Sequence, residues 1–434
     1  MKKTVLTVLL CAVLVTAGQA FAAVHTTLLQ PAPADLVSTM LVPASAAPQP
    51  VYNSNRDPVS FSWPLKADQK IDLGARPVTK LSREYWQRVS ADQLAKGVAI
   101  HVVTPGAVIR INPMGHANAH IQKIDPSGLE IITSSRRHLT AEAATQAIAK
   151  EADLDQAGFQ FPKGTIAFRL KADLGTGTFT IRDTALRAEA ATPYLLSVVE
   201  PHSAAILAMT TKQQALLPGA AFIANVHLKD GNQRIAITRI DASVISPDGR
   251  ITPAHIAQNG VGSATASFTP GRLDPRAAGM WEIKVSTTGN LNGQTVRRDI
   301  RAAFAYSLPT ARLTNDVTID EIPGGGIAAH LGIESSAGGR YEVRGILYGT
   351  NGSGNLAPMG IADTAAWLPD GVNTLTLTFG PRIVEGAGFH APYEVRGLRL
   401  MDQSRMSILR QQARAFVIPR IDANRPSHSR PHVQ

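Results

Sequence analysis

The pentapeptide YEVRG occurs twice in the last third of the chain, at Tyr341–Gly345 and at Tyr393–Gly397. Side chains alternate between the two faces of a β-strand, so each copy places its tyrosine and valine on one face and its glutamate and arginine on the other. The segments that follow, ILYGTNGSG and LRLMDQSRM, do not match, whereas a duplicated domain would extend the similarity. We therefore predict two strands of one β-sandwich. A ligand surface formed by the Glu-Arg edges is the alternative.

The same alternation assigns faces beyond the pentapeptides. In the first copy, Leu347 joins the tyrosine and valine. In the second copy, Arg399 is expected on the apolar face and Leu398 on the opposite face with the glutamate and arginine.

Short β-type segments separated by turn residues fill the chain from residue 214 onward. In WEIKVS, Trp281, Ile283 and Val285 alternate with polar residues, as in a strand with one buried face. Pairs such as Asp230-Gly231 and Asn292-Gly293 mark turns between such segments. Regular short strands of this kind predict two immunoglobulin-like β-sandwich domains, at residues 214–310 and 311–420.

The preceding part, residues 60–213, is predicted to be an α+β domain that is mostly β. SREYWQRVSADQLAKG, residues 82–97, indicates a short helix that begins at Ser82 and ends at Gly97. A second helix is expected over residues 139–154, with Thr140 as its cap. The apolar runs on either side of Thr104-Pro105-Gly106 indicate a β-hairpin.

The N-terminal residues have the features of a secretory signal peptide. Lys2 and Lys3 precede an apolar run from Val5 to Val15, and small residues at Ala20 and Ala22 supply a cleavage site. We expect residues 1–22 to be removed and the protein to be extracytoplasmic, either secreted or periplasmic. Residues 23–59, rich in Ala and Pro, are expected to be a linker or a strap lying on the first domain, and residues 421–434 a disordered tail.

Composition excludes several kinds of site. Cys11, inside the predicted signal peptide, is the only cysteine, so the mature chain has no disulfide and no thiolate metal ligand or nucleophile. The formal net charge is +10, but the basic residues are scattered and do not alternate with aromatic ones, so no nucleic-acid partner is expected. No stretch of the mature chain reaches the length of a transmembrane helix.

The sequence contains no motif that identifies a catalytic site. His116 and His120 in GHANAH are four residues apart and are weak candidates for metal binding, but Ala117 stands where the zinc-protease motif requires glutamate. The nucleophile pentad Gly-x-Ser-x-Gly and the phosphate-binding loops are absent. We predict no catalytic residue and no cofactor. Carboxylates paired only in space would leave no such trace.

The last domain resembles a family of exported proteobacterial proteins of unknown function. The segments GGRYEVRGILYGTNGSGNLAPMGIADTAAWL and APYEVRGLRLMDQSRM are similar to the C-terminal part of proteins that contain domain of unknown function 4785. The segment from VISPDGR to GMWEIKVSTTG is similar to their central module. The resemblance implies an N-terminal domain followed by two immunoglobulin-like domains, and it supplies no known catalytic residues that could be assigned to this sequence.

These observations favour a protein that acts by binding, through adhesion or recognition of a surface or partner, with an unknown protein or glycan as ligand. Loops at the ends of sandwiches are common recognition sites, and the candidates are Asn351, Asn355, Phe389 and His390. Two alternatives stay open. One is an exported hydrolase with its active site in the N-terminal domain, and the other is an accessory protein or inhibitor of another exported enzyme.

Overall fold

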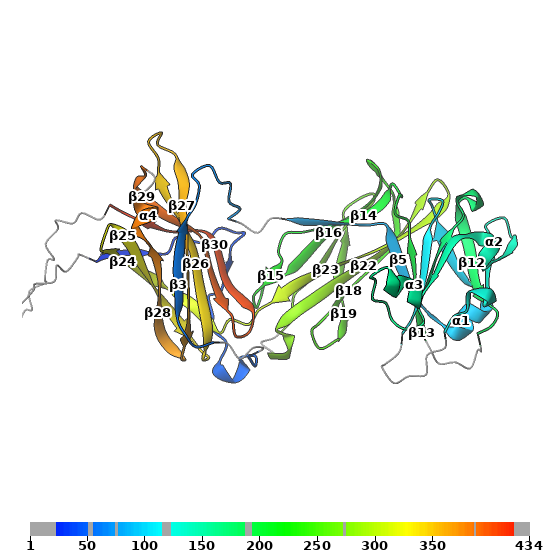
Figure 1. Cartoon of the computed structure of the whole chain (residues 1–434), viewed down its shortest axis with the longest axis horizontal. Coiled ribbons are helices and arrows are strands. Elements are labelled where there is room, and N and C mark those ends of the chain that lie inside the picture. The colour runs from blue at the N-terminus through cyan, green and yellow to red at the C-terminus, as the bar shows by residue number, and fades with distance from the viewer. Residues whose placement is uncertain are drawn as a thin grey trace, which may run out of the picture.

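The structure, a computed structural model, describes residues 23–50, 55–73, 77–114, 123–186, 193–271, 275–385 and 388–420. Antiparallel β-strands dominate it, as predicted, and they form three two-layered units in a row (Figure 1). The predicted signal peptide and the predicted C-terminal tail lie outside the described residues.

The C-terminal sandwich consists of a four-stranded sheet, here sheet I, and a six-stranded sheet, here sheet II. Sheet I has the order β1 (Val24–Thr27), β24 (Ala311–Ile322), β25 (Gly326–Ser335), β28 (Gly371–Phe379). Sheet II has the order β2 (Leu36–Val37), β30 (Ser407–Ile418), β29 (His390–Asp402), β26 (Gly339–Thr350), β27 (Leu356–Leu368), β3 (Val59–Pro64). The facing sides of the two sheets enclose one hydrophobic core.

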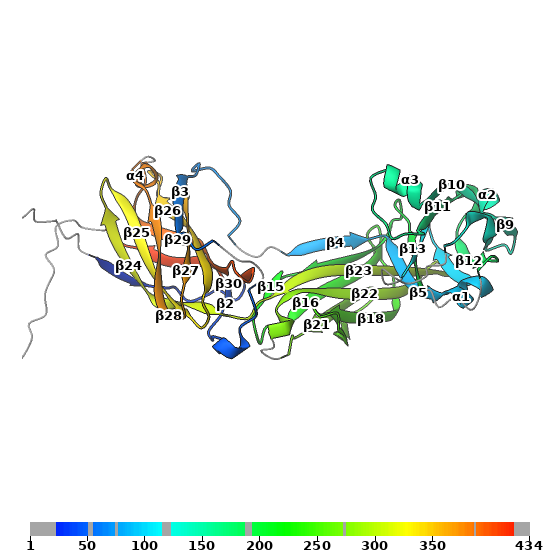
Figure 2. The same ribbon diagram turned by 60° about the horizontal axis from the view of Figure 1, so that its bottom comes forward.

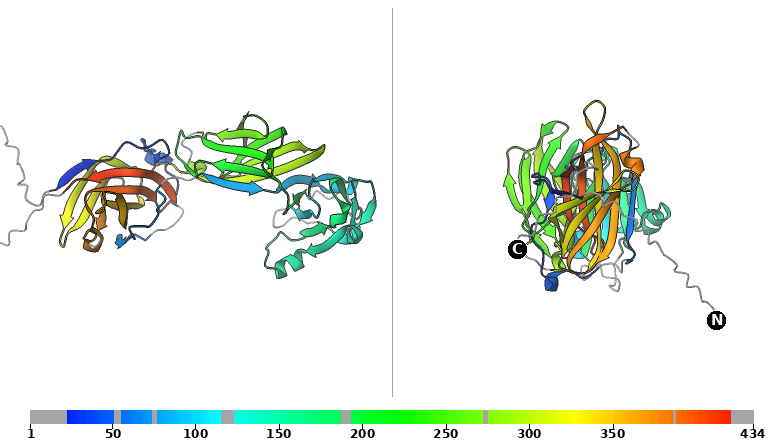
Figure 3. Two further views of the ribbon diagram at one scale, coloured as in Figure 1. Left: turned by 90° about the horizontal axis from the view of Figure 1, so that it is seen from above. Right: turned by 90° about the vertical axis from the view of Figure 1, so that its left-hand side faces the viewer.

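The prediction of a linker at residues 23–59 is wrong, because β1 and β2 lie within this segment and β3 begins at its last residue, and all three are strands of the C-terminal sandwich. β1 pairs with β24, β2 pairs with β30, and β3 pairs with β27. Figures 1 and 3 show these blue strands among yellow, orange and red ones. Proline is tolerated in edge strands, since their outer N–H groups need no ladder partner. The Ala/Pro-rich composition that indicated a linker is therefore compatible with short edge strands.

The two YEVRG copies are neighbouring antiparallel strands of sheet II, so the prediction of two strands in one sandwich is confirmed. Val343 in β26 lies opposite Leu400 in β29, and Leu347 lies opposite Val395. These four side chains are fully buried in the core. The glutamates and arginines of both copies lie on the outer face of the sheet.

The faces predicted beyond the second copy are wrong, because the strand contains a bulge at Gly397. Its φ of 59° lies in the left-handed region, as at the glycine of a common bulge type. The extra residue reverses the alternation, so Leu398 is buried in the core. Arg399 instead lies on the outer face, where it forms an ion pair with Glu342.

The central domain is also a β-sandwich. One sheet has the order β20-β21-β16-β14-β4, with β17 beside β16, and the other has the order β15-β23-β22-β18-β19. Trp281, Ile283 and Val285 all face the core, as predicted. The strands are β4 (Val78–Ser82), β14 (Ala205–Thr211), β15 (Ala215–Leu216), β16 (Phe222–Asp230), β17 (Gln233–Arg234), β18 (Ile237–Ile245), β19 (Ile251–Pro253), β20 (His255–Gln258), β21 (Ser263–Phe268), β22 (Gly279–Leu291) and β23 (Gln294–Tyr306).

Two strands of this central sandwich come from the range predicted for the N-terminal domain. β14 pairs with both β16 and β4. Figure 2 shows β4 along the central sandwich, where the chain passes from the C-terminal to the N-terminal domain. The predicted boundary at residue 213 therefore lies too late in the chain.

The N-terminal domain has two sheets, ordered β10-β11-β7-β13-β5 and β6-β12-β8-β9. Its elements are β5 (Glu84–Ser90), α1 (Ala91–Lys96), β6 (Val98–Val102), β7 (Val108–Pro113), β8 (Leu129–Ile132), β9 (His138–Thr140), α2 (Ala141–Ala144), β10 (Thr145–Lys150), α3 (Glu151–Gln156), β11 (Ile166–Leu170), β12 (Gly177–Asp183) and β13 (Pro193–Val199).

Half of each predicted helix of this domain is a strand. β5 occupies the first half of residues 82–97. α1 begins only at Ala91, where Ser90 caps the helix and forms a capping box with Gln93. The second predicted helix is divided into α2 and α3 by the strand β10. β6 and β7 belong to different sheets, so the apolar runs around Pro105 do not form a hairpin.

A buried ion pair joins the N-terminal and central domains. Arg298, in β23, contacts Glu200 at 2.6 Å, and both side chains are almost completely buried. Glu200 also accepts hydrogen bonds from the backbone N–H groups of Val103 and Thr104, each at 2.7 Å. The contact therefore ties the loop after β6 to the central sandwich.

Candidate functional site

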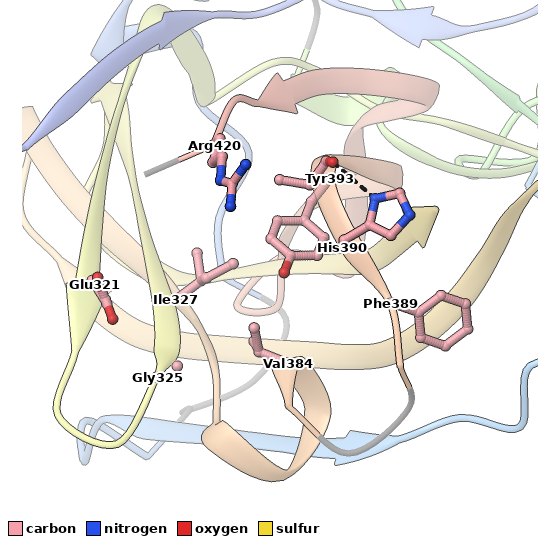
Figure 4. Close-up of a pocket in the computed structure, with 10 residues that line it drawn as sticks. Glu321, Gly325, Ile327, Val384, Phe389, His390, Tyr393 and Arg420 are labelled. Carbon is pink, nitrogen blue, oxygen red and sulfur yellow. Dashed lines mark hydrogen bonds between the residues drawn. The ribbon is translucent and has the colours of Figure 1, made fainter. Parts of the chain in front are cut away.

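A cavity of about 640 Å³ lies at the end of the C-terminal sandwich where β24 and β30 end (Figure 4). Its lining comes from both sheets and from α4 (Pro381–Val384), which precedes β29. The residues are Glu321, Gly325, Gly326, Ile327, Val384, Phe389, His390, Ala391, Tyr393 and Arg420. We call this cavity the end pocket.

The local sequence explains how one wall of the end pocket forms. Gly324 and Gly325 have φ values of 83° and 82°, which allow a tight turn between β24 and β25. A β-carbon on Gly325 would collide with the carboxylate of Glu385. On the other side, Ile383 of α4 is buried in the core. The turn and the helix therefore pass close together and form one wall of the end pocket.

The end pocket combines apolar surface with polar groups of different kinds. Ile327, Val384 and Phe389 provide the apolar part, while Glu321 and Arg420 add opposite charges. Tyr393 lies at the centre of the lining residues (Figure 4). Burial raises the pKa of Tyr393, so its hydroxyl stays protonated at neutral pH and can both donate and accept a hydrogen bond.

Phe389 and His390, two residues proposed from the sequence, line the end pocket. The ring nitrogen Nδ1 of His390 lies 3.1 Å from the carbonyl oxygen of Ala391. His390 is the register partner of Thr350, the last residue of β26. The hairpin that begins at Asn351 therefore leaves the sheet at the same end of the sandwich.

Asn351 and Asn355, the other two proposed residues, shape that hairpin and do not line the end pocket. The Asn351 side-chain oxygen accepts hydrogen bonds from the backbone N–H groups of Ser353 and Asn355, each at 3.0 Å. This arrangement is a side-chain turn of the kind asparagine commonly forms.

The two histidines proposed as weak metal ligands, His116 and His120, lie outside the described residues. In the part of the chain that the structure describes, no three His, Cys, Asp or Glu residues come close enough to hold a metal ion. No helix in this part is long and apolar enough to cross a membrane.

Sequence reasoning missed most of the pocket lining. Glu321, Ile327, Tyr393 and Arg420 lie up to about a hundred residues apart and meet only because the ends of four strands, β24, β25, β29 and β30, converge. The second YEVRG copy predicts only that Tyr393 belongs to a strand. This signal indicates no cavity without knowledge of the strand order.

The fold and the pocket define a chain of three β-rich domains with a ligand-sized cavity at one end. The chain belongs to the DUF4785 family. Residues 50–200 match the N-terminal domain of this family, residues 203–307 its central domain, and residues 310–419 its C-terminal domain.

One solved structure supports the same architecture. The chain is similar to the crystal structure of a DUF4785 family protein from Legionella pneumophila, with 20% identity and a TM-score of 0.68, over 88% of this chain and 98% of that one. A comparison with alpha-2-macroglobulin from E. coli gives 14% identity and a TM-score of 0.28, over 73% of this chain and 20% of that one, too low to indicate a shared fold. A search among curated proteins found no match.

Proposed function

We propose that this protein is an exported binding protein that recognises its ligand through the end pocket of the C-terminal sandwich. The observation that carries the proposal is a cavity of about 640 Å³ in which apolar side chains lie beside Glu321, His390, Tyr393 and Arg420. Ligand sites of globular proteins usually have this size.

The lining favours a small ligand with an apolar body and a polar or charged end. Phe389 and Val384 can contact the body, and the hydroxyl of Tyr393 can bond to the polar end. Glu321 and Arg420 would then select between ligands by charge.

Binding can be tested on the mature chain, residues 23–434, by ligand-observed NMR with a library of aromatic amines, aromatic acids and short peptides. Hits are then measured by calorimetry against Phe389→Ala and Tyr393→Phe. We expect Phe389→Ala to weaken binding about tenfold, because a central aromatic contact often contributes more than 1 kcal/mol.

Phe159→Ala is the matched control, because Phe159 is an exposed phenylalanine of the N-terminal domain. Hits whose affinity is unchanged by Phe389→Ala and Tyr393→Phe would contradict the pocket as the binding site. Export is tested separately. Mass spectrometry of the protein from the producing bacterium should show an N-terminus at Ala23 and no cytoplasmic pool.

A further inference from the structure

The outer face of sheet II carries two rows of side chains that cross its strands. The strand register places the members of each row directly opposite one another. The first row is Phe61, Asp363, Arg344, Arg399 and Gln411, and the second row is Trp63, Ile361, Ile346, Arg396 and Arg414. Five strands about 4.8 Å apart make each row roughly 19 Å long.

The carboxylates of this face are buried, whereas its guanidinium groups reach solvent. The side chain of Asp363 is 5% exposed and that of its partner Arg344 is 37% exposed. Likewise, Glu394 is 5% exposed and its partner Arg414 is 62% exposed. A ligand that approaches this face therefore meets mainly positive charge, although the charges are paired.

The buried carboxylates also hold the arginines in place. Glu394 accepts hydrogen bonds from Nε of Arg414 at 2.7 Å and from Nε of Arg396 at 3.0 Å. Glu342 pairs with Arg399 and accepts a further bond from Gln403 at 2.7 Å. Arginines fixed in this way lose little conformational entropy when they bind a ligand.

An exposed aromatic pair begins both rows. The rings of Phe61 and Trp63 are stacked, with centroids 5.3 Å apart and planes inclined by 9°. Both residues lie on the edge strand β3, and they are 48% and 41% exposed. Large exposed aromatic side chains next to polar groups are typical of binding surfaces.

An unpaired polar atom adjoins this pair. Asp363 lies directly opposite Phe61 in the strand register, and only 4% of the surface of the whole residue is exposed. Its Oδ1 accepts from Arg344, but within the described residues its buried Oδ2 has no hydrogen-bond partner. A ligand hydroxyl group that displaces the side chains covering this oxygen would supply the missing donor.

The geometry points to an acidic polysaccharide as the ligand of this face, bound along the first row. Aromatic rings accept the apolar C–H faces of sugars, and guanidinium groups bind carboxylates through two parallel hydrogen bonds. Sugar hydroxyls supply the donors that Asp363 lacks. The second row is less open, because Leu73 lies close to Gly397 and to Ile346, the residue in the middle of that row.

The test uses the mature chain and polygalacturonate, with its fully methyl-esterified form as the uncharged equivalent. Binding is measured by calorimetry at low ionic strength. Arg344→Gln combined with Asp363→Asn removes the guanidinium without changing net charge or leaving a buried carboxylate unpaired. Phe61→Ala removes one ring of the aromatic pair.

Two matched controls lie elsewhere on the protein. Arg312→Gln combined with Glu334→Gln removes an ion pair of sheet I whose arginine is about as exposed as Arg344. Phe159→Ala removes a ring of the exposed Phe159–Phe161 pair in the N-terminal domain. Thermal melting of each variant confirms that its fold is intact.

We expect polygalacturonate to bind and the methyl ester to bind at least tenfold more weakly. The double variant and Phe61→Ala should each lower affinity about fivefold to tenfold, while the controls leave it unchanged. No binding, equal binding of the methyl ester, or equal losses in face and control variants would overturn the proposal. Tighter binding of single-stranded poly(dT) through Phe61 would also overturn it, in favour of a nucleic-acid ligand. None of these outcomes bears on the end pocket, because these variants leave its lining intact.

Discussion

The two glycines that end the YEVRG copies are needed for different reasons. Gly345 lies in the core, where a β-carbon would meet Leu377 at 2.8 Å and Val395 at 3.0 Å. Gly397 has a positive φ, and a β-carbon there would meet Leu73 at 3.1 Å. The identical pentapeptides therefore have different structural roles, which only the strand register reveals.

Both substitutions to alanine should destabilise the C-terminal sandwich. Gly345→Ala overpacks the core, which costs about 1–3 kcal/mol. Gly397→Ala places a β-carbon in the left-handed conformation, which costs about 1–2 kcal/mol. Urea denaturation measures both values. Gly352→Ala is the control, since a β-carbon there meets nothing within 4 Å. If Gly397→Ala were as stable as the wild type, the bulge would be contradicted.

The ion pair between Glu200 and Arg298 should be costly to break from one side. Arg298→Met leaves the Glu200 carboxylate buried without its cation, which typically costs about 3–5 kcal/mol. Adding Glu200→Gln removes that charge and should restore part of the stability. Calorimetric unfolding of the single and double variants gives the coupling energy. Additive effects of the two substitutions would show that the residues do not interact.

Glu394 should make stability depend on pH in the acidic range. Burial raises its pKa, but the hydrogen bonds from Arg414 and Arg396 more than offset this effect, so the pKa lies below the ordinary value of 4.5. The folded state then binds this proton less readily than the unfolded state. The stabilisation is complete above pH 4.5 and is lost as the pH falls through the folded pKa.

Glu394→Gln tests this dependence, because it cannot titrate. Urea unfolding free energies of the variant and the wild type, measured between pH 3 and pH 7, should differ most at neutral pH and converge in acid. A constant difference over this range would show that Glu394 does not titrate differently in the two states.

Among the elements, regular strands were predictable from the sequence and irregular ones were not. In β22 the alternation of Trp281, Ile283 and Val285 identified both the strand and its buried face. In β5, Tyr85 and Val89 are both buried, but their spacing of four residues fits a strand as well as a helix. The end pocket was only half predictable, because Phe389 and His390 lie on a recognisable loop, whereas Glu321 and Arg420 become neighbours through tertiary structure.

The true start of α1 can be tested by mutation. Ser90 accepts a hydrogen bond from the Gln93 N–H at 3.1 Å, and the Gln93 side chain accepts one from the Ser90 N–H at 2.9 Å. Ser90→Ala should therefore cost about 1 kcal/mol. In a double-mutant cycle, Gln93→Ala should couple to Ser90→Ala but not to Ser82→Ala. Coupling to Ser82 instead would favour a helix over residues 82–97.

At the scale of the whole molecule, the first and the last strands of the described residues, β1 and β30, belong to the same sandwich. β1, β2 and β3 complete the C-terminal domain, and the central and N-terminal domains are inserted between β3 and β24. The family match at residues 310–419 covers only the later part of this sandwich. The N-terminal segment, residues 23–64, therefore gives the C-terminal domain two covalent connections to the rest of the chain, one after β3 and one before β24.

This connectivity predicts that residues 310–420 do not fold alone. Without the N-terminal segment, the edges of β24, β27 and β30 are unpaired, and the core loses Leu28, which packs among its buried residues. Unpaired, apolar strand edges promote aggregation. The isolated fragment should be insoluble or show a broad, weakly cooperative melt, whereas a chain joining residues 23–64 to residues 310–420 through a flexible linker should melt cooperatively. The matched control joins the same segment with Leu28→Asp and Phe61→Pro, which oppose core packing and strand pairing. Equal cooperativity of all three proteins would show that the N-terminal strands are dispensable, because the core of the domain would then form without them.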